Sequence, residues 1–234
     1  MTLRQLGLAM GLASTLHAQP SEGDLRSRLL ARLAHAPGAT AGIFVKDLST
    51  GREVGVNADT SFHAASTMKV PVMIEYFRGL DAGRWSPDAT VMLRNQFASI
   101  VDGSPYSLDA AEDSDSALYV KVGQAVSVRE LVYRMITRSS NLATNAVIAL
   151  VGAESADATA HALGARTIHV RRGVEDNLAY QAGLNNTTSA RDLGALLAAI
   201  AEGTAVSRAR SDEMLGMLEH QEFNDEIPAG LPPG

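Results

Sequence analysis

The chain has 234 residues, of which 46% are hydrophobic and 20% are charged, with a net charge of −6 at pH 7. This length and balance indicate a globular protein with one sizeable core or two unequal lobes, and they exclude fibrous and disordered classes. An acidic balance without a basic patch excludes nucleic acid as a partner. The absence of cysteine excludes disulfides, thiolate metal sites and a cysteine nucleophile.

Residues 1–18 have the pattern of a secretory signal peptide, in which Arg4 precedes an apolar run over 6–13. The run is shorter than the roughly 20 residues that a membrane helix needs, and no later segment qualifies, so we expect no membrane span. The alternative is an N-terminal helix that is retained. If the segment is a signal peptide, the mature protein begins near Gln19 and is secreted or periplasmic.

The next elements are predicted to be a helix and a hairpin. Apolar residues recur at helical spacing over 24–36, and segments 39–47 and 53–57 flank Ser49-Thr-Gly51 as two strands flank a turn. After them the pattern is helical, apart from a polar stretch after Gly83 in which we expect only short helical pieces. The remaining helices are predicted over 66–82, 128–136, 141–151, 155–163, 189–202 and 207–218.

Two strands followed by helices leave a two-stranded sheet, which is marginal alone. The chain ends on Leu231-Pro-Pro-Gly234, which is typical of a turn into a further element. We therefore expect an α/β (α+β) fold of two lobes, one helical and one an antiparallel sheet that is incomplete. A flexible C-terminus is the alternative.

Ser66 and Lys69 form the sharpest local signal, because residues three apart at the start of a helix share a face. A serine hydroxyl is a weak nucleophile until a base takes its proton, and a lysine serves as that base when desolvation lowers its pKa. By itself Ser-x-x-Lys is common. A second polar segment, Ser139-Ser140-Asn141 with Asn145 one turn later, adds a hydroxyl and two amides next to a helix start.

These motifs, in this order, resemble class A serine β-lactamases and the related penicillin-recognising serine enzymes, whose signatures include Ser-x-x-Lys, Ser-Asp-Asn and Lys-Thr-Gly. The resemblance implies that Ser66 is acylated by the β-lactam carbonyl and that Lys69 takes its proton. It implies that Ser139 relays a proton to the leaving nitrogen and that Asn141 holds the acyl amide.

The resemblance also implies structural support from Asn145 and Ser140. Ser140 departs from the family, which usually has aspartate there, and we expect a tuned site because that position mostly braces the loop.

The family's deacylating glutamate matches the segment 171–190, in which Glu175 is the best candidate for the general base. The assignment stays open between Glu175 and Asp176, because Asn177 follows Glu175 by two residues where the family has a spacing of four. An acidic surface turn paired with Arg171 or Arg172 is the alternative.

The third motif, Lys-Thr-Gly, does not occur, since none of the three lysines is followed by threonine and glycine. In the family its strand attracts the substrate carboxylate and supplies an oxyanion N–H. We therefore interpret residues 19–234 as a β-lactamase-like catalytic domain that lacks its C-terminal strands and helix, and we expect little activity from the chain as given.

Three other features carry less weight. His63 lies near Ser66 but is expected to point away, and histidines that stand singly along the sequence predict no metal site or cofactor. The acidic segment 113–116 lacks the spacing of a calcium loop and is interpreted as solvated.

The predicted function is β-lactam hydrolysis through an acyl-serine intermediate, by a monomer acting on a β-lactam or peptidoglycan-like small molecule. The alternatives are a D-alanyl-D-alanine peptidase or esterase on the same scaffold, or a non-catalytic binding protein.

Overall fold

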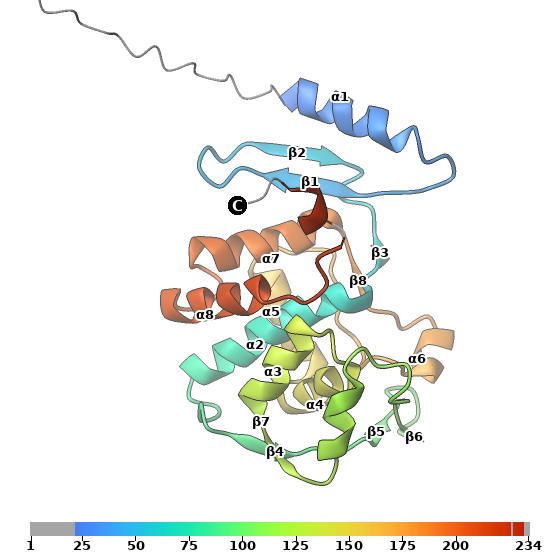
Figure 1. The fold of residues 1–234 in the computed structure, drawn as a ribbon, viewed down its shortest axis with the longest axis vertical. Helices are drawn as coiled ribbons and strands as arrows, with labels where there is room; N and C mark the ends of the chain where they lie inside the picture. Colours follow the sequence, from blue (N-terminus) through green and yellow to red (C-terminus); the bar gives the residue numbers. More distant parts are fainter. Residues whose placement is uncertain (1–21, 226, 232–234) are drawn as a thin grey trace, which may run out of the picture.

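The computed structural model describes residues 22–225 and 227–231. The predicted signal peptide lies outside these residues. A helical body forms most of the molecule, and a β-hairpin with one further helix lies at one end of it (Figure 1). The two-lobe α+β architecture predicted from the sequence is therefore confirmed.

The hairpin consists of β1 (Ile43–Lys46) and β2 (Glu53–Val56), paired antiparallel with Ile43 opposite Val56. It lies between α1 (Glu22–Leu33) and α7 (Ala190–Glu202), as Figure 1 shows. Both strands are shorter than predicted. Since the hairpin packs on α7, the sheet is not the isolated ribbon that the sequence suggested.

Helix α2 (Lys69–Asp81) is the centre of the helical body. Its residues are buried on nearly all sides, including Met73, Ile74 and Phe77. A helix that is apolar all round belongs in the middle of a core. The helices packed around it are α3 (Val128–Thr137), α4 (Asn141–Val151), α5 (Ala153–Ala162) and α8 (Arg208–Glu219).

The long predicted helices are confirmed to within three residues at their ends, but the polar stretch after Gly83 was interpreted wrongly. It contains short strands that pair as β4 with β7 and as β5 with β6, besides the 3₁₀ helix η2 (Ser116–Lys121). Strands of two or three residues are too short to show an alternating pattern. Their bounds are Thr90–Met92, Ala125–Ser127, Phe97–Ala98 and Pro105–Tyr106.

Three further elements near the Ser66 segment were also missed. Strands β3 (Phe62–His63) and β8 (Thr187–Thr188) pair antiparallel, and α6 (Asn177–Gln181) is a short helix. The β3–β8 pair joins residues 62–63, which lead to Ser66, to residues 187–188, which end the segment that carries Glu175. The last element is the 3₁₀ turn η3 (Pro228–Gly230).

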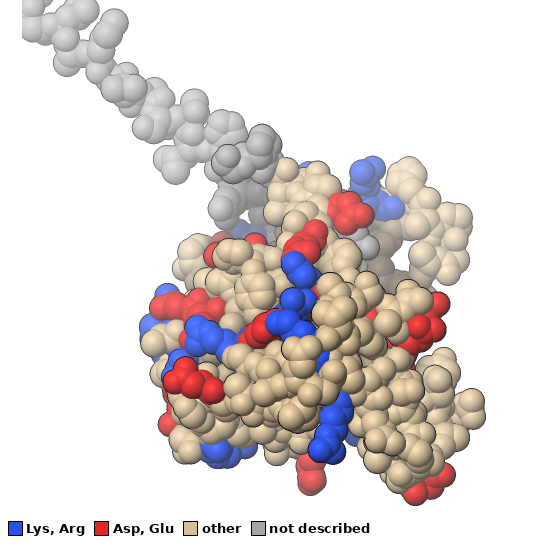
Figure 2. Space-filling view, turned by 60° about the horizontal axis from the view of Figure 1, so that its bottom comes forward, with Lys and Arg blue, Asp and Glu red and all other residues tan. Residues whose placement is uncertain are grey.

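Across the described ranges, no helix has both the length and the hydropathy needed to cross a bilayer. On the face in Figure 2, acidic and basic side chains are interspersed, and neither sign covers a large continuous area.

Gly194 and Gly216 offer a matched test of the contact between α7 and the hairpin. A Cβ on Gly194 would lie 2.3 Å from a ring carbon of Phe44 in β1, whereas a Cβ on Gly216 in α8 meets nothing within 4 Å. We expect Gly216→Ala to stabilise the protein by about 0.5–1 kcal/mol through helix propensity. Gly194→Ala should destabilise it by about 1–3 kcal/mol through overpacking. Urea unfolding measures both, and an equal gain in the two variants would contradict the close packing.

Candidate active site

Ser66 lies in the 3₁₀ turn η1 (Ala65–Met68), which leads directly into α2. Pro71 explains why the segment begins as a 3₁₀ turn. It has no backbone N–H, so it cannot donate the α-helical hydrogen bond to the Thr67 carbonyl. Ala65 has a positive φ of 45°, which is strained for a residue with a Cβ. This backbone holds the Ser66 side chain on the exposed side of the turn, directly above the first residue of α2.

The Lys69 amine is the centre of the site. The residue is only 2% exposed, and its Nζ lies 3.1 Å from Ser66 Oγ and 2.9 Å from Ser139 Oγ. Nζ also donates to the Ser139 carbonyl at 2.6 Å and to Asn141 Oδ1 at 3.0 Å. Because those last two oxygens only accept, they occupy two N–H groups and leave the third position of the nitrogen facing the two hydroxyls.

A neutral amine can satisfy three of the four contacts in this arrangement. Its two hydrogens go to the carbonyl and the amide oxygen, and its lone pair accepts from a hydroxyl. Burial lowers the pKa of Lys69 from 10.5 to about 8, although the Asp113 and Glu175 carboxylates act to raise it. Lys69 is thus poised to exchange a proton near neutral pH.

Ser139 and Asn141 come from the turn between α3 and α4. Ser139 has a positive φ of 56°, and its hydroxyl lies 2.8 Å from Ser66 Oγ. Ser140 is fully buried, and as the N-cap of α4 its Oγ accepts from Ala143 N–H. The strained turn aims the Ser139 and Asn141 side chains at Lys69 from the start of a helix that Ser140 caps.

Glu175 reaches the site from the loop before α6. Its Oε1 accepts a hydrogen bond from Asn141 Nδ2 at 2.8 Å, and its backbone φ is 61°. Asn145 holds the loop from behind, because its side chain exchanges two hydrogen bonds with the backbone of Val174, at 2.8 and 3.0 Å. A Cβ on Gly173 would lie 2.7 Å from Asn145 Oδ1, so the loop makes a close approach that glycine permits.

The two candidate carboxylates, Glu175 and Asp176, lie in different surroundings. Asp176 is 1% exposed, caps α6, and accepts hydrogen bonds from Ser99 Oγ and Ile100 N–H. Burial acts to raise the pKa of Asp176, but hydrogen bonds from the Ile100 and Ala179 amides and from Ser99 outweigh it and keep the pKa below its usual value. Asp176 holds the loop, and Glu175 is the carboxylate directed at Asn141.

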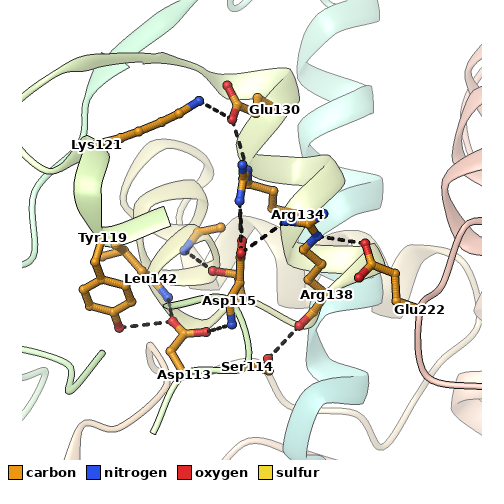
Figure 3. A network of polar contacts seen from close by, with 12 residues as sticks. Asp113, Ser114, Asp115, Tyr119, Lys121, Glu130, Arg134, Arg138, Leu142 and Glu222 are labelled. Carbon is orange, nitrogen blue, oxygen red and sulfur yellow. Dashed lines mark hydrogen bonds and ion pairs between the residues drawn. The ribbon is translucent and has the colours of Figure 1, made fainter. Parts of the chain in front are cut away.

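Asp113 is a site residue that the sequence analysis missed. The prediction that segment 113–116 is solvated is wrong, because Asp113 and Asp115 are 6% and 3% exposed. The Asp113 carboxylate accepts hydrogen bonds from the first backbone N–H groups of α4, Asn141 at 3.1 Å and Leu142 at 2.8 Å. It also accepts from Tyr119 Oη (Figure 3). A carboxylate suits this place, since it satisfies N–H groups that have no partner within the helix.

Asp115 is held by one arginine of α3 and by the residue that follows this helix. Arg134 Nη1 lies 3.0 and 2.8 Å from the two carboxylate oxygens, and Arg138, the C-cap of α3, lies 3.5 Å from one of them (Figure 3). Arg134 and Arg138 are four residues apart, so their side chains point in a similar direction. That spacing was the available signal for cationic partners, but nothing local in the sequence pairs them with the acidic segment.

His63 does not join the reactive group. Its Nδ1 accepts a hydrogen bond from the Ala65 backbone N–H at 3.1 Å, which helps to hold the turn before Ser66.

The chain matches the Beta-lactamase enzyme family over residues 24–234. A β-lactamase from Streptomyces fradiae is 26% identical over 232 residues, which cover 97% of this chain and 72% of that protein. The structure of a β-lactamase from Sphaerobacter thermophilus is 28% identical, with a TM-score of 0.72 over 90% of this chain and 74% of that one. A mutant of PBP-A, solved as an acyl-enzyme complex with penicillin G, is 26% identical with a TM-score of 0.73, over 92% of this chain and 77% of that one.

The fold defines a class of serine hydrolases, that of the class A enzymes, and Ser66 beside the buried Lys69 is the candidate nucleophile. Within that class, the chain belongs to the β-lactamase enzyme family.

We expect Asp113→Asn to destabilise the protein by about 1–3 kcal/mol. The Asp113 carboxylate now accepts hydrogen bonds from the backbone N–H groups of Asn141 and Leu142. The NH₂ group of an asparagine would face one of these donors, and both would then be buried without an acceptor. Asp88 is exposed and serves as the control, since Asp88→Asn should change stability by less than about 0.5 kcal/mol. Denaturant unfolding measures both variants, and equal small effects would show that the Asp113 bonds contribute little.

Proposed function

We propose that the protein hydrolyses β-lactams through an acyl-enzyme formed on Ser66. The observation that carries this proposal is the position of the buried Lys69 amine, within hydrogen-bond distance of both Ser66 Oγ and Ser139 Oγ. Membership of the β-lactamase family supports the substrate class.

Acylation begins when Ser66 Oγ attacks the lactam carbonyl carbon and its proton passes to Lys69 Nζ. The Ser66 backbone N–H, at the start of the helix, donates to the developing oxyanion. When the lactam C–N bond breaks, the proton moves from Lys69 through the Ser139 hydroxyl to the leaving nitrogen. The 2.9 Å contact between Lys69 Nζ and Ser139 Oγ supports such a relay.

Deacylation is assigned to Glu175 as general base. The Glu175 carboxylate takes a proton from a water molecule as the water oxygen attacks the ester carbonyl, and the proton returns to Ser66 Oγ when the ester bond breaks. The hydrogen bond from Asn141 keeps this carboxylate next to the site. Asn141 also serves to hold the acyl amide of the substrate, and Ser140 and Asn145 support the segments that carry Ser139 and Glu175.

The Lys-Thr-Gly strand of the family would supply the carboxylate site for substrate and a second oxyanion donor. Loss of one such donor typically costs about 10²–10³ in rate. Activity is therefore best measured on a protein that includes such a strand. We further propose that the protein is exported by the signal peptide at 1–18 and acts as a monomer without a catalytic cofactor.

A D-alanyl-D-alanine peptidase or other penicillin-binding enzyme is the second candidate. The similarity to PBP-A, which was captured as a penicillin acyl-enzyme, and the unusual spacing from Glu175 to Asn177 favour it. Such an enzyme would acylate with the same Ser66, Lys69 and Ser139, and would deacylate slowly.

Intact mass spectrometry after mixing with penicillin G distinguishes these functions. For a hydrolase we expect turnover with no lasting adduct in the wild type, and a lasting adduct in Glu175→Gln because deacylation loses its base. Ser66→Ala should give neither adduct nor turnover. Glu112→Gln is a matched control, since Glu112 is exposed, and it should behave as the wild type does.

A lasting adduct in the wild type would identify the penicillin-binding candidate. An adduct that persists in Ser66→Ala would overturn the assignment of the nucleophile.

The pH dependence of acylation tests Lys69 as the base. Only the neutral amine accepts the Ser66 proton, so the single-turnover acylation rate should rise with pH and level off above about 8. Glu175→Gln removes a negative charge that raises the pKa of Lys69, so the inflection should move to lower pH. Loss of acylation in Glu175→Gln would instead make Glu175 the acylation base.

A further inference from the structure

A second group of chemically capable side chains lies outside the Ser66 site. Asp157 and His161 are one turn apart on α5, and His169 lies in the segment that follows, where its backbone pairs with Thr187. One potential ligand atom from each of the three lies within 4.8 Å of the others. Histidines that stand singly along the sequence thus come together around one carboxylate.

The hydrogen bonding of His161 leaves one ring nitrogen without a proton. Its Nε2 lies 2.9 Å from the carbonyl oxygen of Ile168, which can only accept, so Nε2 carries the hydrogen. In a neutral imidazole, Nδ1 then bears a lone pair. This Nδ1 lies 3.5 Å from Asp157 Oδ2, so two lone-pair atoms face each other across a gap that suits a cation.

The carboxylate and the second histidine are also held in place. Asp157 Oδ1 accepts the Val170 backbone N–H at 2.7 Å and lies 3.8 Å from His169 Nδ1. Ile168 and Val170 are the sequence neighbours of His169. The Ile168 carbonyl accepts a hydrogen bond from His161 and the Val170 amide donates one to Asp157, so the backbone is held on both sides of His169. Outer hydrogen bonds of this kind orient the ligands of metal ions in proteins.

The chemistry of the three ligands selects the kind of ion. Two imidazole nitrogens and one carboxylate oxygen suit zinc and its neighbours in the first transition row, whereas calcium and magnesium prefer oxygen alone. Tetrahedral zinc with ligands at 2.0–2.1 Å needs ligand atoms about 3.3 Å apart. Small rotations of side chains that are 24–41% exposed bring the observed distances into that range.

We propose that Asp157, His161 and His169 bind a divalent transition-metal ion of the zinc type, with water in the remaining position. A bound ion would join α5 to the segment that continues from His169 through Gly173 to Glu175. It would therefore stabilise the base of the loop that carries the Glu175 carboxylate. This site does not depend on the function proposed for Ser66.

The test is a titration of the chelator-treated protein with Zn²⁺, followed by calorimetry and by thermal unfolding. We expect one equivalent to bind and the Tm to rise by about 5–10 °C at a hundredfold excess over Kd. His169→Gln should weaken binding at least about tenfold to a hundredfold, since loss of even an outer-shell partner has that effect. His161→Gln should do the same.

His220→Gln is the matched control, because His220 lies at the end of α8 and should leave Zn²⁺ binding unchanged. Circular dichroism of each variant without metal verifies that it is folded. Zn²⁺ binding that is equal in the wild type and His169→Gln would overturn the proposal. Absence of Zn²⁺ binding to the wild type would overturn it too. These measurements do not involve β-lactam turnover. The metal site can therefore be rejected while the proposed activity stands, and the reverse is also true.

Discussion

The arrangement of the site depends on one constraint, the burial of the Lys69 amine at the start of the central helix. A buried nitrogen that lacks partners is costly, so acceptors must reach it from outside α2. They are the Ser139 carbonyl, in the turn between α3 and α4, and Asn141 Oδ1, at the start of α4. The same desolvation lowers the pKa of the amine, so the feature that makes the lysine expensive to bury also makes it a base.

Backbone strain accompanies this convergence. The non-glycine residues with positive φ in the described part of the chain include Ala65, Ser139 and Glu175, one in each segment that meets at Lys69. Such conformations cost about 1–3 kcal/mol each and persist only where the surroundings enforce them. Here hydrogen bonds from neighbouring side chains enforce them. Asp113 accepts from the first backbone N–H groups of α4, and Asn145 accepts from the backbone N–H of Val174, next to Glu175. Ser140 contributes a hydroxyl cap, while the carboxylate at this helix start comes from Asp113.

Long amphipathic or apolar segments were predictable because their periodicity extends over several turns, as in α3, α4 and α7. The pair Ser66 and Lys69 was predictable because its spacing along a helix is local. The paired strands β4–β7 and the short helix α6 were not, since two to five residues carry no period. Asp113 and His169 show the deeper limit: their roles come from partners distant in sequence, Asn141 for one and Asp157 for the other, and composition alone suggested solvated or isolated groups.

Asn141 links the two halves of the proposed reaction. Its Oδ1 accepts from the Lys69 amine and its Nδ2 donates to the Glu175 carboxylate, so the amide can take only one orientation. An amide has two Nδ2 hydrogens and two Oδ1 lone pairs, so a substrate amide can bind to Asn141 while both of these contacts persist. The proposed acylation base and the proposed deacylation base therefore stay joined through one side chain when a substrate is bound. The Glu175 end of this connection depends on the hydrogen bonds from Asn145 to the backbone of Val174, next to Glu175.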